Sequence, residues 1–275
     1  MSIDNNEGLI VLSNDVAECK ISLFGGNIVS YRPKTQDHDV FWLGDLNKFD
    51  NAQAIRGGIP VCWPRFAEEI LNNNLPRHGF ARLSMWELKS VSVDESNMEV
   101  ELLLRPDAKY NVNVSARLFI KVTDKLECSL ETINEGDKEF SFSEALHSYF
   151  NVGDRDKVKI EGLQGCQYKN SLDGKTYNLK NDLQIKDEFD SAFINHKTEV
   201  KIVDPVLNRI IYLHKQGSNT TVVWNPNKDL AEMSEGQYKN FVCVEPANQG
   251  EAFVTLGPGD KHKMTMVVSV VNIND

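Results

Sequence analysis

The chain has 275 residues and a formal net charge of −10, with 41% hydrophobic and 25% charged residues. This composition is ordinary for a globular protein and supplies enough apolar side chains for a sizeable core. The acidic balance disfavours nucleic acid and anionic membranes as partners, and no window approaches the ~20 apolar residues of a membrane helix.

The cysteines and the first residues of the chain indicate the cellular compartment in which the protein works. The five cysteines are odd in number, widely separated and free of any CxxC spacing, which argues against a disulfide framework and against a zinc site. The first residues, MSIDNNEGLIVL, lack the basic start and the long apolar run of a signal peptide. We therefore expect a cytoplasmic protein with reduced thiols.

Short segments of alternating apolar and polar residues follow one another along the chain, with period two rather than 3.6. In chain order they are Gly8–Leu12, Cys19–Leu23, Val40–Leu43, Met98–Leu104, Val112–Val122, Lys125–Ile133, Val158–Glu161, Val200–Val203, Arg209–Leu213, Thr220–Trp224 and Lys263–Val271. Within Lys125–Ile133, apolar and polar residues fall on opposite faces, as a half-buried antiparallel strand requires.

Helical patterns are scarce, with short candidates only around Arg65–Leu71 and Asp229–Tyr238. No alternation of strands with helices, no internal repeat and no linker rich in Pro, Gly or Ser is present. The pattern predicts an all-β protein, a large antiparallel β-sandwich, with residues 1–275 forming a single domain.

Four segments interrupt the alternation with polar groups that a sheet does not need: Ala52–Pro64, Leu75–Arg82, Ser143–Asp154 and Phe241–Asn248. The second segment contains a cluster of cationic residues in an acidic chain. Arg77, His78 and Arg82 lie within six positions, and Arg56 occurs in the first segment. Guanidinium groups bind oxyanions well, so the cluster indicates a small anionic ligand, although His78 in a solvated loop is the alternative.

The third and fourth segments contain candidates for proton transfer. His147 lies among apolar and aromatic neighbours that would shield its imidazole from water, and Glu245 ends the apolar run Val242–Val244. A buried carboxylate is costly unless it is paired or has a raised pKa that suits a general base. From pattern alone, a hydrogen-bonded structural histidine and an ion pair at a strand end remain the more common alternatives.

Other patterns carry less information. Asp190 in EFDSAFIN would ordinarily be a turn residue or a cap. The Gly57-Gly58 and Gly25-Gly26 pairs lack the strand–GxGxxG–helix setting of a nucleotide site. The absence of HExxH, EF-hand and clustered Cys/His patterns gives no support for a metal site.

Taken in order, the motifs resemble those of the aldose 1-epimerase (mutarotase) superfamily, and specifically its glucose-6-phosphate 1-epimerase branch. The resemblance spans nearly the whole chain: GGNIVSYRP, FWLGDL, AIRGGIPVCWPRF, RHGFAR, EALHSYF, FDSAF, VWNPN, YKNFVCVEPAN and GPGD. It implies a sandwich of two large antiparallel sheets with a sugar-binding cleft and neither a metal nor an organic cofactor.

The resemblance also implies roles for individual residues. The histidine of EALHSYF, His147, would be the general acid, and the glutamate of VCVEPAN, Glu245, the general base. His78 would hold a sugar or ring oxygen, and Asp190 would accept hydrogen bonds from sugar hydroxyls. For the phosphate, the implied ligands are Arg56 with Arg77 or Arg82, and a further polar contact from Gln53 is plausible.

The implied reaction interconverts α and β anomers of hexose 6-phosphates, with glucose 6-phosphate foremost. In that reaction a base takes the anomeric proton while a histidine tuned to hold its proton protonates the ring oxygen. A non-catalytic sugar-phosphate binding protein and a mutarotase for neutral aldoses are the alternatives. The expected partner is a small-molecule sugar phosphate, and we expect a monomer. In NPNKDLAEMSEGQ, Asn227 departs from the pattern of relatives, which leaves the contact made there open.

Overall fold

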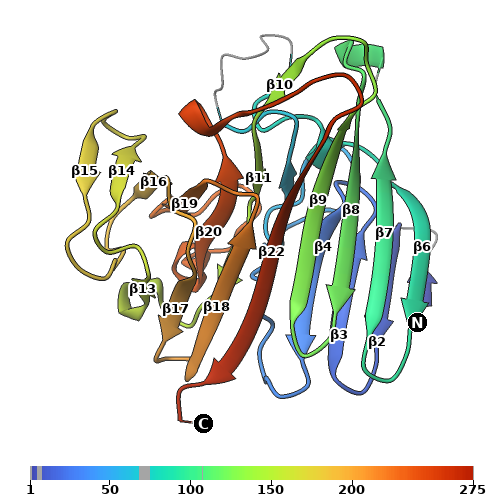
Figure 1. Ribbon diagram of the computed structural model, residues 1–275. Coiled ribbons are helices and arrows are strands. Elements are labelled where there is room, and N and C mark those ends of the chain that lie inside the picture. The colour runs from blue at the N-terminus through green and yellow to red at the C-terminus, as the bar shows by residue number, and fades with distance from the viewer. Residues whose placement is uncertain (1, 5–7, 68–74, 107, 275) are drawn as a thin grey trace.

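The computed structural model describes residues 2–4, 8–67, 75–106 and 108–274 (Figure 1). Strands dominate, and two sheets of eight strands each form the body of the molecule. This confirms the predicted all-β sandwich. Within the described residues, no helix has the length and apolarity needed to span a bilayer.

The first large sheet, here called the backing sheet, crosses one side of the molecule. Its strands run in the spatial order β13 (Lys159–Glu161), β17 (Val200–Asp204), β18 (Arg209–Gln216), β22 (Lys261–Asn272), β9 (Leu126–Asn134), β8 (Val114–Val122), β7 (Met98–Leu104) and β6 (Glu87–Val93). Every pairing in it is antiparallel. The 12-residue β22 joins its two halves.

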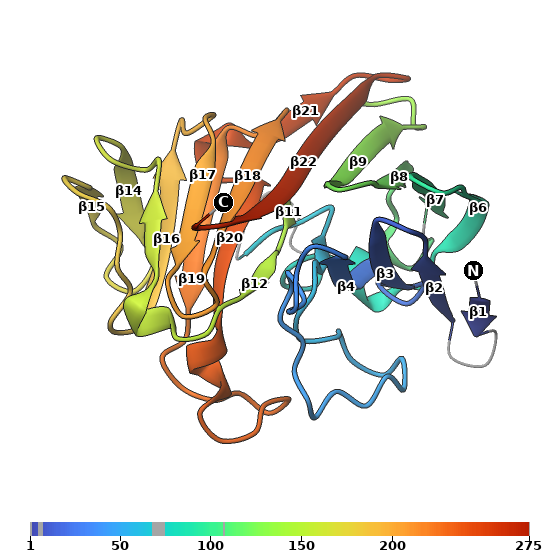
Figure 2. The same ribbon diagram turned by 90° about the horizontal axis from the view of Figure 1, so that it is seen from below.

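The second large sheet, here called the site sheet, lies behind one half of the backing sheet (Figures 1 and 2). Its order is β15 (Thr176–Asn178), β14 (Gln167–Asn170), β16 (Phe189–Ile194), β19 (Thr220–Asn225), β20 (Phe241–Asn248), β11 (Glu144–Leu146) and β5 (Val61–Cys62), and β12 (Tyr149–Asn151) also pairs with β20. All eight residues of β20 are buried, so this strand lies at the centre of the fold.

Two smaller sheets complete the strand arrangement. One contains β1 (Ser2–Asp4), β2 (Leu9–Ser13), β3 (Ala17–Ser22) and β4 (Asn27–Pro33), and the other pairs β10 (Phe140–Phe142) with β21 (Val254–Leu256). The helices are single 3-10 turns: η1 (Ala81–Leu83), η2 (Ala108–Tyr110), η3 (Arg155–Lys157), η4 (Gln237–Asn240) and η5 (Gly250–Ala252). Figure 1 shows β2, β3 and β4 behind the β7–β9 half of the backing sheet.

The alternation of β9 fills the core between these layers. Leu126, Cys128, Leu130 and Thr132 are buried on one face, as the sequence pattern predicted. The Thr132 hydroxyl accepts a hydrogen bond from the indole N–H of Trp63 (2.9 Å), which satisfies both polar groups inside the core. All five cysteines are free thiols.

Some predicted elements differ from the structure. Val40–Leu43 forms isolated bridges through Phe41 and Leu43 rather than a regular strand. The candidate helix at Arg65–Leu71 extends beyond the described residues, and its described part, 65–67, is not helical. The candidate at Asp229–Tyr238 is turns followed by η4. In the described parts of these segments, loop contacts set the backbone, and periodicity does not encode such contacts.

Candidate active site

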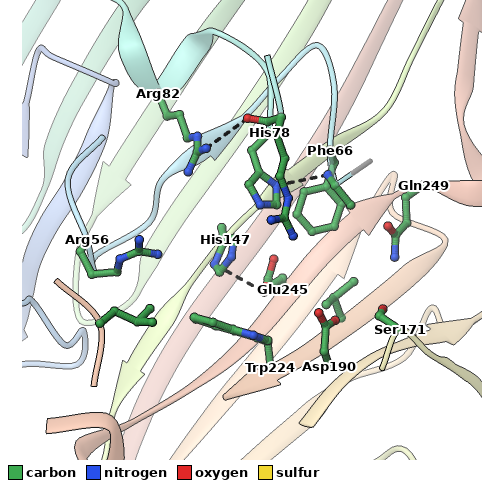
Figure 3. A pocket seen from close by; sticks show the side chains of 14 residues that line it. Arg56, Phe66, His78, Arg82, His147, Ser171, Asp190, Trp224, Glu245 and Gln249 are labelled. Carbon is green, nitrogen blue, oxygen red and sulfur yellow. Dashed lines mark hydrogen bonds and ion pairs between the residues drawn. The ribbon is translucent and has the colours of Figure 1, made fainter. Parts of the chain in front are cut away.

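A cavity of about 600 Å³ opens on the face of the site sheet that points away from the sandwich core (Figure 3). It is lined by Arg56, Phe66, Ala67, Arg77, His78, Arg82, His147, Ser171, Asp190, Val222, Trp224, Leu230, Glu245 and Gln249. The structure thus brings together seven of the eight residues singled out from the sequence. Gln53 is exposed in a loop and does not line this cavity.

Strand register brings the acid/base candidates together. Ala145 of β11 pairs with Ala247 of β20, so His147, just after β11, lies beside Glu245. The His147 Nδ1 and Glu245 Oε1 atoms are 3.4 Å apart. On the other side of β20, Val222 of β19 lies opposite Glu245, and Asp190 lies on the next strand, β16. The backbone pairing of these strands therefore fixes the positions of His147 and Glu245 relative to each other.

Burial controls the ionisation of Glu245. Its side chain is 1% exposed, and within the described residues neither carboxylate oxygen has a hydrogen-bond partner. Burial, and then the charge of Asp190, raise the pKa of Glu245 well above its ordinary value. A raised pKa increases the proton affinity of the carboxylate once it is ionised, which is what a general base needs.

Aromatic rings enclose the imidazole of His147. It stacks on Tyr149 with centroids 4.9 Å apart and an angle of 14°, and Trp224 meets it edge-on at 5.7 Å. Its backbone N–H donates to the carbonyl of Pro60 (3.0 Å). These contacts orient the ring before any ligand arrives.

The expectation that His147 holds its proton is wrong for the cavity without substrate. Burial, followed by the electrostatic influence of His78, Arg82 and Arg56, lowers the pKa of His147 well below 6.5. The sequence showed an apolar environment around His147, but it did not show that cations from other segments face the same ring.

His78 lies in a tight turn, and its surroundings determine both its charge and which ring nitrogen carries the proton. His78 has a φ of 63° and Gly79 a φ of 69°, and a Cβ on Gly79 would lie 2.0 Å from the carbonyl oxygen of Trp63. The backbone N–H of Ala67 donates to His78 Nδ1 (3.2 Å). Burial and the nearby arginines lower the pKa of His78 to about 3, so the ring is neutral and its proton lies on Nε2. His78 is therefore a hydrogen-bond donor for a sugar oxygen.

Two arginines lie on the same side of His147 (Figure 3). Arg56 donates from Nε to Glu232 Oε2 (3.2 Å) and from Nη1 to the Tyr149 hydroxyl (3.2 Å). Arg82 donates to the carbonyl of Arg77 (3.1 Å), and its buried Nε has no hydrogen-bond partner in the described part of the chain. Guanidinium groups in this arrangement suit the oxygens of a phosphate.

The other side of the cavity is lined mainly by uncharged polar groups and a carboxyl group. Figure 3 shows Asp190, Ser171 and Gln249 there, across Glu245 from Arg56 and Arg82. Burial raises the pKa of Asp190, while a hydrogen bond from Ser171 and the charge of Arg77 oppose the shift. These groups match the hydroxyls of a sugar. Arg77 interacts with Asp190, whereas Arg82 faces His147.

Sequence reasoning missed seven of the lining residues, among them Gln249, Trp224, Ser171 and Leu230. Gln249 directly follows the VCVEPAN motif, and Trp224 stands in the quoted VWNPN motif, so their positions were available signals. Ser171 and Leu230 lie in turn segments that carry no comparable pattern.

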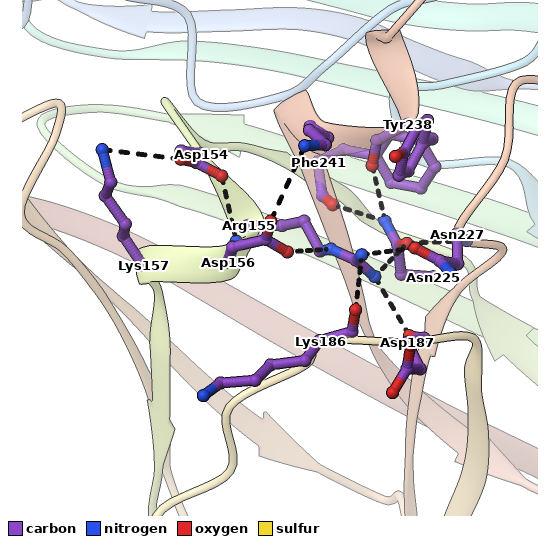
Figure 4. A network of polar contacts seen from close by, with 11 residues as sticks. Asp154, Arg155, Asp156, Lys157, Lys186, Asp187, Asn225, Asn227, Tyr238 and Phe241 are labelled. Atoms are coloured by element: carbon purple, nitrogen blue, oxygen red, sulfur yellow. Dashed lines mark hydrogen bonds and ion pairs between the residues drawn. The ribbon is translucent and has the colours of Figure 1, made fainter.

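Asn227 belongs to a structural network rather than to the cavity. Its side-chain oxygen accepts a hydrogen bond from Arg155, which is 2% exposed (Figure 4). Arg155 also donates to Asn225 Oδ1 and to the carbonyls of Lys186 and Asp187, each at 3.0 Å. The network fixes the end of β19 next to the segment that leads into β16.

The structure also groups possible metal donors that the spacing did not reveal. One donor atom each from His147, Cys243 and Glu245 lies within 4.8 Å of the others. Burial raises the pKa of Cys243 and of Glu245, whereas a metal ligand must be deprotonated, so we assign no metal to this group. The proton-transfer chemistry described below uses His147 and Glu245 directly.

The fold and the cleft place the chain in the class of galactose mutarotase-like β-sandwiches. It matches a Salmonella typhimurium crystal structure described as a "putative mutarotase", with a TM-score of 0.88 and 30% identity, covering 96% of this chain and 90% of that one. A galactose mutarotase-like protein from Lactobacillus casei shares the fold at a TM-score of 0.76 and 17% identity, covering 96% of this chain and all of that one.

The chain belongs to the aldose 1-epimerase family, whose model matches residues 8–269. An Escherichia coli K12 relative named "Putative glucose-6-phosphate 1-epimerase" is 34% identical over 254 residues, covering 88% of this chain and 84% of the relative. A Haemophilus influenzae relative of the same name is 34% identical over 218 residues, covering 78% and 75%.

Proposed function

We propose that the protein interconverts the α and β anomers of hexose 6-phosphates, with glucose 6-phosphate as the first candidate. The observation that carries this proposal is the His147–Glu245 pair in the same cavity as Arg56 and Arg82. The names of the relatives point the same way. As part of this proposal, residues 1–275 act as one domain in the cytoplasm.

The reaction needs two proton transfers and no net change of charge. The Glu245 carboxylate takes the proton from the anomeric hydroxyl while protonated His147 donates its proton to the ring oxygen. The bond between the anomeric carbon and the ring oxygen breaks, and the electrons on the anomeric oxygen form a carbonyl. In the open-chain sugar the aldehyde group rotates about its bond to the next carbon. The hydroxyl formed from the ring oxygen then attacks the other face of the carbonyl, and the two protons return to His147 and to the anomeric oxygen.

The remaining residues bind and orient the substrate. Arg56 and Arg82 bind the phosphate, which places the sugar ring over Glu245. Asp190 accepts hydrogen bonds from sugar hydroxyls, and the Nε2–H of His78 donates to a sugar or ring oxygen. Trp224 covers the ring, as aromatic faces commonly do in sugar sites.

The test is the rate of approach to anomeric equilibrium for α-glucose 6-phosphate, compared with α-glucose and α-galactose and with a control that contains no enzyme. Acceleration of the phosphorylated sugar with preference over the neutral sugars is expected. Equal acceleration of neutral sugars would instead favour a mutarotase for neutral aldoses. Binding without acceleration would favour a non-catalytic sugar-phosphate binding protein.

The Glu245→Gln variant tests the base. An amide of the same shape cannot accept the anomeric proton, so we expect turnover to fall about 100-fold or more with the fold intact. Circular dichroism and thermal unfolding serve as the fold control. Turnover near that of the unaltered protein would remove Glu245 from the mechanism.

A further inference from the structure

The charges that face His147 come from several elements and are mostly positive. Arg82 of η1 and Arg56 before β5 face the imidazole as cations, and the neutral ring of His78 lies beside it. The groups that oppose them are Glu245 of β20, 3.4 Å from Nδ1, and the more distant Glu232, which pairs with Arg56. Cys243, Tyr149 and Trp224 complete the surroundings as neutral groups. Within the described residues, no carboxylate forms an ion pair with Arg82.

A direct chain of contacts links the anion-binding side of the cavity to the imidazole. Arg56 donates to the Tyr149 hydroxyl, and the Tyr149 ring stacks on His147. In the described part of the chain, the second terminal nitrogen of Arg56 makes no hydrogen bond. An anion bound to that nitrogen would contact the Arg56 guanidinium. Only Tyr149 lies between this guanidinium and His147, the group that must protonate the sugar.

Protonation of His147 is therefore opposed until something balances the arginines. Burial and the electrostatic influence of His78, Arg82 and Arg56 lower the pKa of His147. A dianion held by Arg56 and Arg82 cancels two of these contributions, because its charge acts over short distances in a site with little water. Where the ring is mostly neutral, each unit of rise in pKa increases the protonated fraction about tenfold.

We propose that a free tetrahedral dianion, bound by Arg56 and Arg82 in place of the sugar's own phosphate, activates a second reaction, the anomerisation of unphosphorylated hexoses. This inference rests on the proposed function and extends it. The phosphate then contributes to the chemical step as well as to binding. The ion itself exchanges no atoms or electrons, since Glu245 and His147 move the same two protons as before.

Sulfate is the probe, because it remains a dianion across the working pH range and is too weak a base to catalyse much anomerisation itself. The experiment measures the enzyme-dependent rate for α-glucose with sodium sulfate and with sodium chloride at equal ionic strength. Each condition has a control without enzyme. We expect sulfate to accelerate the enzymatic reaction about tenfold or more. The acidic group in the pH profile should also titrate at higher pH when sulfate is present.

The Arg82→Gln variant tests where the ion acts, and Arg117→Gln is the matched control, since Arg117 lies on the backing sheet with Glu101. Acceleration by sulfate should disappear in Arg82→Gln and persist in Arg117→Gln. If glucose 6-phosphate is turned over while sulfate fails to accelerate glucose, or only inhibits, this proposal is wrong and the proposed function stands. If glucose 6-phosphate is not turned over and sulfate has no effect, both are wrong.

Discussion

Tyr149 contacts Arg56 with its hydroxyl group and His147 with its ring. Its hydroxyl accepts from Arg56 (3.2 Å), and its ring stacks on His147. Tyr149→Phe removes the first contact and keeps the second, so Arg56 loses one of the two groups that orient it. We expect KM for glucose 6-phosphate to rise about tenfold, in line with the loss of one hydrogen bond to a charged group, with a smaller change in kcat. Steady-state anomerisation kinetics measure both constants.

The control for this prediction is Tyr149→Leu, which also removes the stacking ring. That variant should lower kcat more than Tyr149→Phe does, because the His147 imidazole loses its orientation. An unchanged KM in Tyr149→Phe would show that the hydroxyl does not position Arg56 for the phosphate.

Single residues were predictable from sequence where a motif surrounds them. EALHSYF and VCVEPAN marked His147 and Glu245, and the structure places the two side by side. Gln53 was not predictable in this way, because a loop residue near a motif can point to solvent. The ionisation of His147 was also hidden, since it depends on arginines that reach the cavity from separate segments.

At the scale of elements, a buried polar cluster joins β11, β20 and β22. Glu144, which is 0% exposed, accepts from Asn248 (2.9 Å) and pairs with His262 Nε2 (3.0 Å). Burial lowers the pKa of His262, but the hydrogen bond and charge of Glu144 outweigh it, so the net pKa is raised above 6.5. Along the sequence, Glu144 lies three residues before His147, and Asn248 lies three residues after Glu245.

This cluster makes stability depend on pH. A folded-state pKa above the unfolded one stabilises the fold fully below the unfolded value, and that contribution is lost as pH rises through the folded value. We therefore expect His262→Gln to lower the free energy of unfolding more at about pH 5.5 than at about pH 8.5. Urea unfolding at the two values measures the difference. His214→Gln is the control, because His214 pairs with Glu199 while its side chain is 55% exposed and should matter little at either pH. Equal losses for His262→Gln at both values would contradict the assignment.

Several strands with one buried face were predictable from their alternation, but β4, which is mostly buried, and polar edge strands were not. Val112–Val122 and Lys125–Ile133 correspond closely to β8 and β9 because their alternation matches the packing of the core. The edge strand β6 was missed, since its burial alternates only between exposed and half-buried residues. Val40–Leu43 shows the opposite error, as a buried apolar run can lie in the core without regular pairing.

At the scale of the whole molecule, composition and periodicity predicted the sandwich but not the way in which distant segments close one cavity. Arg155 contributes to that assembly from η3, at the end of β19. Its guanidinium ties η3 to the segment before β16 and to the end of β19, and so supports the backbone that carries Asp190 and Trp224 (Figure 4). No sequence pattern marked this residue, because its partners are backbone carbonyls and amides that only the fold brings together.

Truncation of Arg155 should therefore affect both stability and binding. Arg155→Ala leaves several buried acceptors without donors, and we expect the free energy of unfolding to fall by about 3 kcal/mol or more. Arg155→Lys keeps the charge but not the planar fork, so it should recover only part of this loss. Because Asp190 and Trp224 shift with the network, KM for glucose 6-phosphate should rise in both variants, while Arg117→Ala on the backing sheet should leave it unchanged. Urea unfolding and anomerisation kinetics measure the two effects. A destabilised Arg155→Ala protein with an unaltered KM would show that the network stabilises the fold without positioning the sugar site.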